Sequence, residues 1–417
     1  MKIAIVGSGI AGNVAAWHLN REHEITVFEA EDYVGGHSNT LEMQSETGPV
    51  FLDTGFMVFN DRTYPNFLHL MDELDVGARE SEMSFSVQCK KSGLEYNGSN
   101  FNGLFAQRRN LFRPSFHKMI RDILRFNREA LPFLGEQESD MSLGDYLDQG
   151  DYSKQFIDQY LIPMGAAIWS AEPEMMRQMP AQFFIRFFDN HGLLSLENRP
   201  KWKVVEGGSQ AYVRKLVAGH ESRIRLSCPV QSVIRNANEV LIKTAYSEAE
   251  SFDCVFFACH SDQALAMIEA PTQTEHEILG AIPFQNNEVI LHSDSSLMPR
   301  KRAAWASWNY HVPVEGDGRA ALTYHLNRLH SLTCKRQFFV TLNSGLQIRP
   351  ELVIKRYNYT HPVFTLAGVE AQGRQKELNG QNRSYFCGAY WRNGFHEDGV
   401  ASALAALGHF KQANSSG

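Results

Sequence analysis

The first twelve residues constrain the fold of this chain more than any other segment does. Residues 2–6 (KIAIV) form a short apolar run with β-branched side chains, which is typical of a buried parallel strand. The glycine turn Gly7-Ser8-Gly9-Ile10-Ala11-Gly12 follows at once, and residues 13–20 (NVAAWHLN) have helical character. A second strand is predicted over residues 24–29 (EITVFE), ending in an acid. This order of strand, glycine turn, helix, strand and acid predicts a dinucleotide-binding unit.

Each part of this unit has a physical role. Gly7 permits the tight turn, Gly9 lets the backbone approach a pyrophosphate, and Gly12 lets the helix pack closely on the strand. The helix N-terminus offers free N–H groups and the positive end of its dipole to the phosphates. Glu29, about 20 residues after Gly9, can accept hydrogen bonds from the ribose hydroxyls of an adenosine. Three neighbours of these residues complete the expected contacts: Ile10, Ala11 and Ala30.

Composition excludes several other classes of protein. The formal charge of −7 argues against nucleic acid as a main partner. No run approaches the roughly 18 apolar residues that span a bilayer, and the N-terminus lacks the cleavage-like site of a signal peptide. The cysteines have neither disulfide nor metal spacing, so we expect reduced thiols, a cytoplasmic protein and no metal site. They are Cys89, Cys228, Cys254, Cys259, Cys334 and Cys387.

The residues after Glu29 indicate which dinucleotide is bound. Residues 29–37 (EAEDYVGGH) resemble the flavin-dependent amine oxidase and phytoene desaturase superfamily, in which Gly-Gly-Arg lies along the FAD pyrophosphate. Gly35 and Gly36 match that pattern, whereas His37 replaces the arginine, and a neutral imidazole gives less charge to a diphosphate. The resemblance also implies that Gly55 in residues 50–56 (VFLDTGF) lies beside the flavin and that the Val230 backbone contacts the adenine. It therefore implies non-covalently bound FAD.

A second flavin-binding pattern lies near the C-terminus. Residues 384–407 (SYFCGAYWRNGFHEDGVASALAAL) predict a strand that ends at Gly388, a polar loop, and a helix opened by Asp398-Gly399-Val400. Such a helix N-terminus can stabilise negative charge on the reduced flavin, and the resembling superfamily has the same order of elements here. We therefore expect these four residues to contact the cofactor.

This segment departs from the amine oxidases at two places. Those enzymes usually carry an acid directly after the strand-ending glycine, where this chain has Ala389. They often place a tyrosine in the loop as one wall of an aromatic cage, and the nearest equivalents here are Phe395 and His396. The departures make an amine substrate less favoured than the superfamily name suggests.

The later segments predict a chain that returns repeatedly to the cofactor domain. Residues 203–216, a strand over 225–235 and a buried strand over 252–258 all look like parts of it. We expect an α/β FAD-binding domain, Rossmann-like and of the glutathione-reductase type, built from residues 1–75, 200–287 and 363–417. Residues 76–199 and 288–362 should form an α+β substrate domain with an antiparallel sheet. No second GxGxxG is present, so a separate nicotinamide site is not expected.

Several phrases narrow the resemblance to one bacterial branch. NRPKWKVVEGGSQAYV, HPVF and above all GAYWRNGFHEDG are similar to flavin proteins that accompany cyclopropane-fatty-acid-synthase-like methyltransferases. That branch includes a desaturase of methyl-branched acyl chains on the route to furan fatty acids. The resemblance implies an FAD-dependent oxidoreductase that dehydrogenates a small-molecule or phospholipid acyl chain by hydride transfer to flavin N5, with a lipid methyltransferase as partner. A flavin amine oxidase and a non-catalytic flavin-binding partner of such a methyltransferase are the alternatives.

An acyl substrate makes two demands on the site. A flavin takes hydride readily only from carbon whose developing cation is stabilised, so the chain should already be unsaturated. The enzyme must supply an apolar tunnel beside the flavin and a base for the second proton. His396 is the candidate catalytic group, because imidazole exchanges a proton near neutral pH. The candidate tunnel residues are all aromatic: Trp305, Trp308, Tyr310, Tyr324, Tyr390, Trp391 and Phe395.

Residues 107–132 (QRRNLFRPSFHKMIRDILRFNREALP) stand out by charge. Between residues 108 and 128 they carry seven arginines and lysines and one acid, a net of +6 in a chain of −7. Apolar residues from Phe116 onward, including Leu124 and Leu131, fall at helical spacing, and Arg121, Arg125 and Arg128 share another face. Such a helix can lie on an anionic bilayer, which would make the protein peripherally membrane-associated. A surface helix packed on its own domain is the other interpretation.

Overall fold

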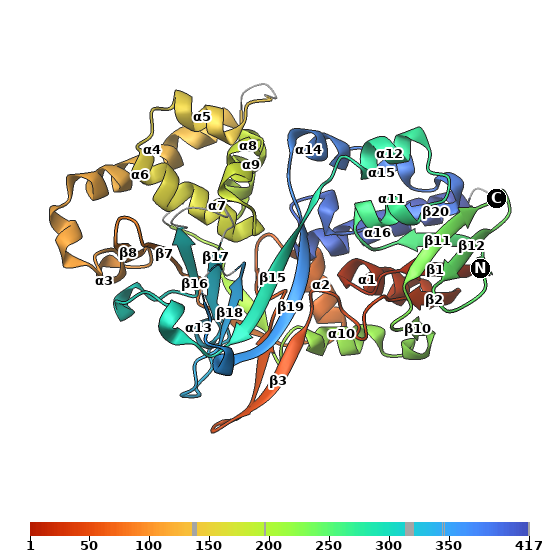
Figure 1. Cartoon of the computed structure of the whole chain (residues 1–417). Coiled ribbons are helices and arrows are strands. Elements are labelled where there is room, and N and C mark those ends of the chain that lie inside the picture. The colour runs from red at the N-terminus through yellow and green to blue at the C-terminus, as the bar shows by residue number, and fades with distance from the viewer. Residues whose placement is uncertain (136–139, 196, 313–320, 344, 346, 416–417) are drawn as a thin grey trace.

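The computed structural model describes residues 1–135, 140–195, 197–312, 321–343, 345 and 347–415. Figure 1 shows two lobes, and both chain termini lie in the same lobe. That lobe is built on a five-stranded parallel sheet with the order β10-β2-β1-β14-β20. Its strands span Lys2–Val6 (β1), Glu24–Phe28 (β2), Ile224–Arg225 (β10), Cys254–Phe257 (β14) and Ser384–Phe386 (β20).

Helix α1 (Ile10–Leu19) follows β1 and packs on this sheet beside the C-terminal helix α16 (His396–Ser415), whose Phe410 also contacts the sheet. The apolar strands β1 and β14 are almost completely buried, which explains their continuous hydrophobic runs. All pairings in the sheet are parallel, so the carboxyl ends of its strands meet at one edge. Ligands bind at this edge in open α/β sheets. The arrangement confirms the predicted α/β fold.

The single strand predicted over residues 225–235 is wrong. The chain leaves the parallel sheet after β10, and Ser227 adopts a left-handed conformation with a φ of 49°. The backbone amides of Ser227 and Cys228 donate to the carbonyls of Glu31 and Glu29, at 2.8 and 2.7 Å. The chain then enters β11 (Val230–Arg235), which belongs to a separate antiparallel sheet with β12 (Val240–Thr244) and β13 (Glu250–Phe252). Only residues 226–229 separate the two strands, and Leu226 and Cys228 continue the alternation of apolar residues, so the pattern did not reveal the break.

The second lobe contains a seven-stranded sheet with the order β19-β15-β18-β17-β16-β7-β8. All of its pairings are antiparallel except that of β16 with β7. The strands span Phe85–Cys89 (β7), Leu94–Asn97 (β8), Phe284–His292 (β15), Trp308–Val312 (β16), Ala321–His325 (β17), Phe339–Leu342 (β18) and Val353–Pro362 (β19). The long ribbon of β15 and β19 runs between the two lobes (Figure 1). The predicted domain boundaries stay a prediction.

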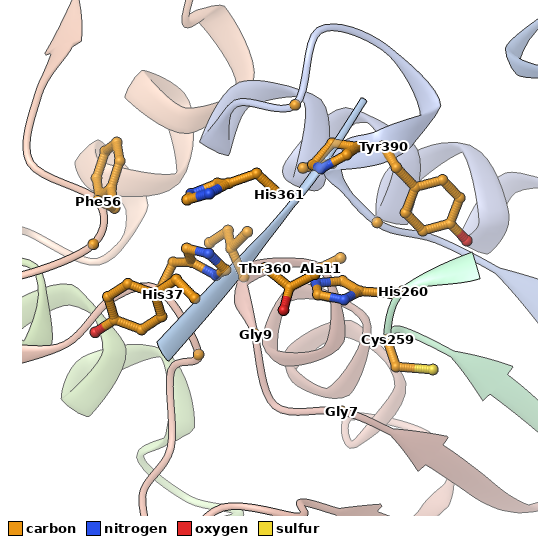
Figure 2. A pocket seen from close by; sticks show the side chains of 18 of the residues that line it. Gly7, Gly9, Ala11, His37, Phe56, Cys259, His260, Thr360, His361 and Tyr390 are labelled. Atoms are coloured by element: carbon orange, nitrogen blue, oxygen red, sulfur yellow. The ribbon is translucent and has the colours of Figure 1, made fainter. Parts of the chain in front are cut away.

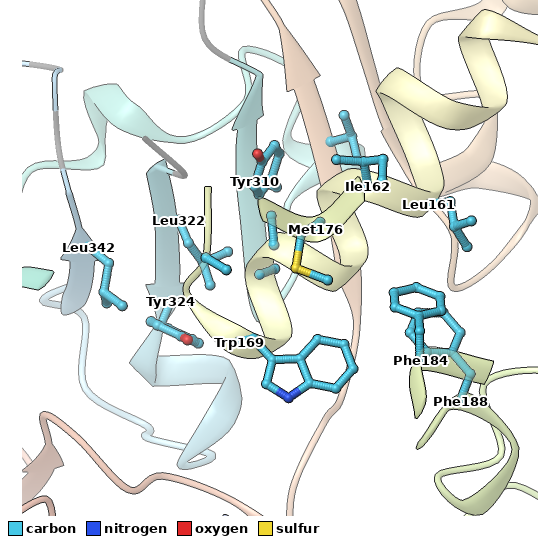
Figure 3. Close-up of a cluster of buried hydrophobic side chains, with 14 of the residues drawn as sticks. Leu161, Ile162, Trp169, Met176, Phe184, Phe188, Tyr310, Leu322, Tyr324 and Leu342 are labelled. Atoms are coloured by element: carbon cyan, nitrogen blue, oxygen red, sulfur yellow. The ribbon is translucent and has the colours of Figure 1, made fainter. Parts of the chain in front are cut away.

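A layer of helices covers this sheet and shares its core. Figure 3 shows Trp169 and Met176 from the helical layer against Tyr310 and Leu322 of the sheet. The layer consists of α4 (Pro114–Phe133), α5 (Leu143–Gln149), α6 (Lys154–Phe156), α7 (Ile162–Trp169), α8 (Pro173–Gln178) and α9 (Ala181–Asn190). Among the described helices, none is long and apolar enough to cross a membrane.

The remaining elements connect and flank the two lobes. Strand β9 pairs with both β5 and β6, so residues near 60, 80 and 203 meet in one small sheet. Its strands are β5 (Phe59–Asn60), β6 (Ala78–Glu80) and β9 (Trp202–Val205), and a separate two-stranded sheet consists of β3 (Thr40–Ser45) and β4 (Gly48–Asp53). The helices are α2 (Pro65–Glu73), α3 (Phe101–Leu104), α10 (Gln210–Val217), α11 (Ser261–Met267), α12 (Gln273–Leu279), α13 (Leu326–Leu329), α14 (Leu366–Gln372) and α15 (Gln375–Leu378).

A chain of buried polar side chains crosses the seven-stranded sheet. Nε2 of His292 lies 2.7 Å from the hydroxyl of Thr341, which lies 2.9 Å from that of Thr323. Nε2 of His311 lies 3.0 Å from the Thr323 hydroxyl. Burial lowers the pKa of both His292 and His311 to about 4, so both imidazoles are neutral at pH 7.

The low pKa values of these histidines predict that the stability of the protein depends on pH, and that this dependence is weaker in His311→Gln. The unfolded chain takes up a proton near pH 6.5, whereas folded His311 does so only near pH 4. Stability is therefore fully present above pH 6.5 and is lost as the pH falls toward 4, by about 1.4 kcal/mol per pH unit for each such group. Urea unfolding between pH 7 and 4.5 should show a shallower loss in His311→Gln. His69→Gln is the control, because His69 is exposed. If the free energy of unfolding changed equally with pH in His311→Gln and in wild type, the low pKa of His311 would be contradicted.

Candidate functional site

A cavity of about 720 Å³ lies along the carboxyl edge of the parallel sheet and continues toward the second lobe. Figure 2 shows the glycine turn below it and several rings around it, including Phe56, His361 and Tyr390. Residues from both lobes line it, so the site exists only where the lobes meet. Its size is that of a site for a cofactor or small molecule. The cavity has three parts: an end at the glycine turn, a middle part with imidazole rings, and an apolar end.

The glycine turn fits the approach of a phosphate group. A Cβ on Gly12 would lie 2.0 Å from the Gly7 carbonyl oxygen, so the close packing of α1 on the turn requires glycine there. A Cβ on Gly9 would meet no atom within 4 Å, and Gly9 lines the cavity, so a side chain there would occupy space that a ligand can use. The first N–H groups of α1 follow at Ile10 and Ala11, which also line the cavity.

Glu29 lies at the same end of the cavity with an incompletely used carboxylate. Its Oε2 accepts from the Ser8 amide at 2.8 Å and from the Ser8 hydroxyl at 2.5 Å. Its Oε1 accepts from the Glu31 amide at 2.9 Å. A carboxylate has about four acceptor positions, so one remains for a hydroxyl group. Ala30 and Val230 line the cavity beside it, as expected for an adenosine site.

The middle of the cavity is bounded by two backbone segments in contact. A Cβ on Gly55 would lie 2.4 Å from the His37 carbonyl oxygen, which accepts from the Phe56 amide at 2.7 Å. Gly35 and Gly36, which precede His37, line the cavity as well, and Gly36 lies close to Gly9. Nε2 of His37 is buried, and no described residue hydrogen-bonds to it. An orphaned nitrogen of this kind fits a site whose ligand supplies the missing partner.

Two further histidines face the same region, and sequence reasoning did not find them. His260 follows β14, and His361 lies near the end of β19, with its ring 5.1 Å from that of His37 (Figure 2). Nδ1 of His361 lies 2.8 Å from the amide nitrogen of Asn287, which donates to it, so the neutral ring carries its hydrogen on Nε2. Burial lowers the pKa of His37 and His260 to about 4 and that of His361 to about 3. The middle of the cavity therefore presents three neutral imidazoles at pH 7.

The position of His260 could have been inferred from the sequence. It directly follows the buried strand that pairs with β1, at the sheet edge where ligands bind in this class of fold. His361 offered no comparable signal, because β19 belongs to the other sheet and reaches the cavity only through the tertiary fold.

The far end of the cavity is apolar. Charged side chains among the described lining residues are confined to Glu29 and Glu31, both at the opposite end. Nε1 of Trp169 donates to the Asn393 carbonyl at 3.2 Å, which joins the helical layer to the loop before α16. The polar residues Ser170 and Asn393 also lie at this end, beside Trp169. The other lining residues there are Met57, Val58, Ile168, Trp169, Trp308, Tyr324, Phe364 and Phe395.

Four of the seven predicted aromatic wall residues line the cavity and three do not. Trp308, Tyr324, Tyr390 and Phe395 line it. Tyr310 shares a strand face with Trp308 but lies about 7 Å further along, inside the core under the helices (Figure 3). Nε1 of Trp305 donates to the Pro299 carbonyl at 2.7 Å, and Trp391 is buried in a core cluster beside Tyr390. These three rings lie outside the lining. Residue type alone could not distinguish them from the lining rings, because it does not tell how deep along an element a ring lies.

His396, the candidate catalytic group, lines the cavity, and its catalytic role stays a prediction. Its Nε2 lies 2.8 Å from the Ser38 hydroxyl and 2.9 Å from the Tyr212 hydroxyl. Its ring stacks on Phe56 with centroids 3.5 Å apart. Burial holds the pKa of His396 well below its usual range, so the ring is neutral and does not titrate near pH 7.

The helix predicted to open at Asp398 begins two residues earlier, at His396. Oδ2 of Asp398 accepts from the amides of Asn393 and Phe395, at 3.1 and 2.9 Å, so this side chain holds the preceding loop. A Cβ on Gly399 would lie 2.6 Å from Cγ2 of Ile10, so Gly399 allows α16 to approach α1.

Gly388 lines the 720 Å³ cavity, whereas Asp398, Gly399 and Val400 lie behind the lining. Asp398 lines a second cavity of about 320 Å³ together with Arg62, Arg392 and Glu397. Burial raises the pKa of Asp398 to about 7. Cofactor contacts from residues 398–400 stay a prediction.

Comparison with known proteins agrees with this geometry. The family described as flavin containing amine oxidoreductase matches residues 10–290 of the 417. AofH of Mycobacterium tuberculosis, which carries the name of a flavin-containing monoamine oxidase, is 26% identical over 60% of this chain and 55% of its own. The chain thus spans about half the length of that relative. A 1-hydroxycarotenoid 3,4-desaturase of Flavobacterium is 36% identical over 23% of this chain and 18% of its own.

Two solved structures share the fold over nearly the whole chain. Cyclohexylamine oxidase from Brevibacterium oxydans has a TM-score of 0.71 at 14% identity and 99% coverage of both chains. The CLA-producing fatty acid isomerase from P. acnes has a TM-score of 0.69 at 15% identity and 98% coverage of both. Both comparisons establish the fold.

Proposed function

The chain belongs to the family of flavin-containing amine oxidoreductases, and on that premise we propose that its substrate is an unsaturated or methyl-branched fatty acyl chain, which it dehydrogenates. The protein is an FAD-dependent oxidoreductase. The methyltransferase-associated branch, with a lipid methyltransferase as partner, is part of the same proposal.

FAD fits the residues that line the cavity. The turn at Gly9 and the N-terminus of α1 would hold the pyrophosphate, and the free acceptor position of Glu29 would hold the ribose. His37 would supply its orphaned nitrogen as a hydrogen-bonding group. When bound, FAD supplies the hydride acceptor, flavin N5. The residues of the apolar end would then exclude water and align an alkyl chain beside it.

The observation that carries the proposal is the uncharged, apolar end of the cavity. Its rings and aliphatic side chains suit an acyl chain, because burial of apolar surface is the interaction that such a wall can offer. The described lining has no carboxylate near this end that could attract a cationic amine.

The two residues that could have formed an amine cage are engaged elsewhere. Phe395 stacks on Phe187 with centroids 5.2 Å apart, and His396 stacks on Phe56. Among the described ring contacts, Phe395 and His396 do not pair with each other. This arrangement favours an acyl chain over a small amine.

The relatives are compatible with either substrate class. The fold is shared by an amine oxidase and by a fatty acid isomerase at nearly the same TM-score. A carotenoid desaturase among the sequence relatives supports desaturation of an already unsaturated chain as a reaction for this family. The choice between the classes therefore rests on the cavity and calls for a direct test.

The test is anaerobic reduction of the flavin. The purified holoenzyme would be mixed without oxygen with phospholipids that contain methyl-branched unsaturated chains, and the flavin absorbance would be followed. Bleaching by the lipid and not by a panel of amines is the expected result. Bleaching by an amine alone would overturn the acyl-chain proposal. If neither bleaches a flavin that is fully bound, a non-catalytic role beside a methyltransferase becomes the better proposal.

Ile168→Trp should abolish the bleaching while leaving the cofactor in place. Ile168 lies near the end of α7 and lines the apolar end, so an indole there would fill the space proposed for the acyl chain. We expect the rate of lipid-dependent bleaching to fall by about a hundredfold or more, because misplaced reactants lose most of the advantage of alignment. Leu404→Trp is the matched control, since Leu404 is exposed on α16. An undiminished rate in Ile168→Trp would place the substrate elsewhere.

A further inference from the structure

We propose that one end of the second lobe docks on a bilayer that contains anionic phospholipids. The docking surface consists of Phe101, Phe112 and the outward stripe of α4, which is Arg121, Leu124, Arg128 and Leu131. It lies at the end of the lobe that carries α3 and α4 (Figure 1). The proposal goes beyond the reaction proposed above and does not depend on its substrate.

Helix α4 has two faces, and only one is used by the protein itself. Phe116, Met119, Phe126 and Phe133 are buried in the core of the lobe. Part of the apolar stripe predicted from the sequence therefore packs against the core of the lobe. Leu124 and Leu131, which the sequence pattern grouped with that stripe, instead point outward and are 48% and 44% exposed. They alternate with Arg121 and Arg128 at spacings of three and four residues, so all four share one face.

The exposed apolar side chains of the protein are concentrated at this end. Phe112 is 86% exposed and Phe101 is 63% exposed, and both values are extreme for phenylalanine. Eight large apolar side chains are exposed in the described chain, and four of them belong to this surface. The other four are scattered: Met1, Leu226, Tyr246 and Leu404. A cluster of exposed apolar side chains of this kind is typical of an interaction site.

Ring contacts join the two parts of the surface. The Phe101 ring lies 4.8 Å from that of Phe105, which lies 6.1 Å from that of His117. His117 is exposed one turn before Arg121, and its Nε2 bonds the Leu111 carbonyl at 2.8 Å. Phe112 follows Leu111 directly. These contacts therefore bring both phenylalanines to the N-terminal part of α4, where the outward stripe begins.

The charge of this face specifies the partner. Residues 108–128 carry a net charge of +6 in a chain of −7. Arg125 is paired with Asp122 and Glu129 and covers Tyr152. Arg128 lies 3.4 Å from Glu129, whereas none of the described ion pairs involves Lys118 or Arg121. Unpaired cations beside exposed phenylalanine and leucine match the headgroups and acyl boundary of an anionic leaflet.

Other partners fit this face less well. A nucleic acid would meet the cations but would leave the leucines exposed, and the overall charge of −7 opposes it. A second copy of the same surface would bring like charges together. An anionic bilayer therefore fits both the cations and the apolar side chains of this face.

The experiment is flotation of the holoenzyme with vesicles of straight-chain phosphatidylglycerol and phosphatidylcholine, against vesicles of phosphatidylcholine alone. We expect binding to the anionic vesicles at low salt and release at high salt. These lipids lack methyl branches, so binding is separated from turnover. The double variant Arg121→Glu/Arg128→Glu should bind at least about tenfold more weakly, because each cation near the surface adds to the attraction.

Phe112→Ser should weaken binding as well, whereas Tyr246→Ser is the matched control because Tyr246 is a 78% exposed aromatic outside the surface. Unchanged flavin absorbance shows that each variant is folded. Three results would overturn the proposal: no flotation with the anionic vesicles at low salt, undiminished flotation of the double variant, or tighter binding to duplex DNA than to the vesicles.

Discussion

Replacement of Gly12 by alanine is expected to yield a protein that has lost most of its flavin and about 3 kcal/mol of its stability. The added Cβ would lie 2.0 Å from the Gly7 carbonyl oxygen and 3.1 Å from Cβ of Ala258. The first contact is with backbone, so the clash cannot be relieved by a side-chain rotation. Helix α1 would have to move away from the turn. Its N-terminal amides would then move from the place where they meet the pyrophosphate.

Two measurements check this expectation, the ratio of flavin to protein after purification and the free energy of unfolding in urea. Gly408→Ala is the matched control, because Gly408 lies in α16 and a Cβ there meets no atom within 4 Å. That substitution should leave the flavin content unchanged and stabilise the helix by roughly 0.5–1 kcal/mol. Full flavin content in Gly12→Ala would show that the cofactor is not held at this turn.

The sequence predicted the cofactor end of the site because its determinants are local. The turn between β1 and α1 needs glycine at three fixed positions, and the acid at the end of β2 lies at a fixed distance from them. Gly9 and Glu29 both line the cavity as expected. Continuous apolar runs were likewise sufficient to predict β1 and β2, whereas the strand predicted over residues 252–258 is divided between β13, which ends at Phe252, and β14 (Cys254–Phe257).

The sequence could not predict contacts that arise only when distant segments meet. Glu397 accepts from the amides of Asn66 and Phe67, some 330 residues away, and so caps the start of α2. His361 enters the cavity from a strand of the other lobe. No local pattern announces either contact. The sequence did not predict the lowered pKa of His396 for the same reason, since its burial is created by Phe56 and Tyr212 from other parts of the chain.

Residue type alone also could not predict which apolar side chains are buried, because burial depends on their position along a strand or around a helix. Trp308 and Tyr310 are alike in character and share a strand face, yet one lines the cavity and the other is 1% exposed in the core. In α4, Leu124 had the same sequence spacing as buried residues and turned out to be exposed. Periodicity identifies a face of a helix, but the width of the buried stripe is set by what packs against it.

Asp398 is expected to control both the loop before α16 and the pH dependence of stability. Its carboxylate accepts from the amides of Asn393 and Phe395, and that loop lines the main cavity. Asp398→Ala leaves two partly buried amide donors without an acceptor, so we expect a loss of about 3 kcal/mol and a lower flavin content. Asp145→Ala is the control, because Asp145 also lies in the first turn of a helix but is exposed.

The conservative variant Asp398→Asn separates charge from hydrogen bonding. Burial raises the pKa of Asp398 to about 7, whereas an unfolded aspartate titrates near 4. Between these values the folded protein holds a proton that the unfolded chain has lost, so stability falls as the pH rises from 4 to 7 and is level above 7. Asp398→Asn keeps an acceptor oxygen and lacks this ionisation. Its stability relative to wild type should therefore rise by up to about 1.4 kcal/mol per pH unit over that interval. Urea unfolding at pH 5, 6, 7 and 8 measures the difference, and a constant difference across the series would show that Asp398 is already ionised at pH 5.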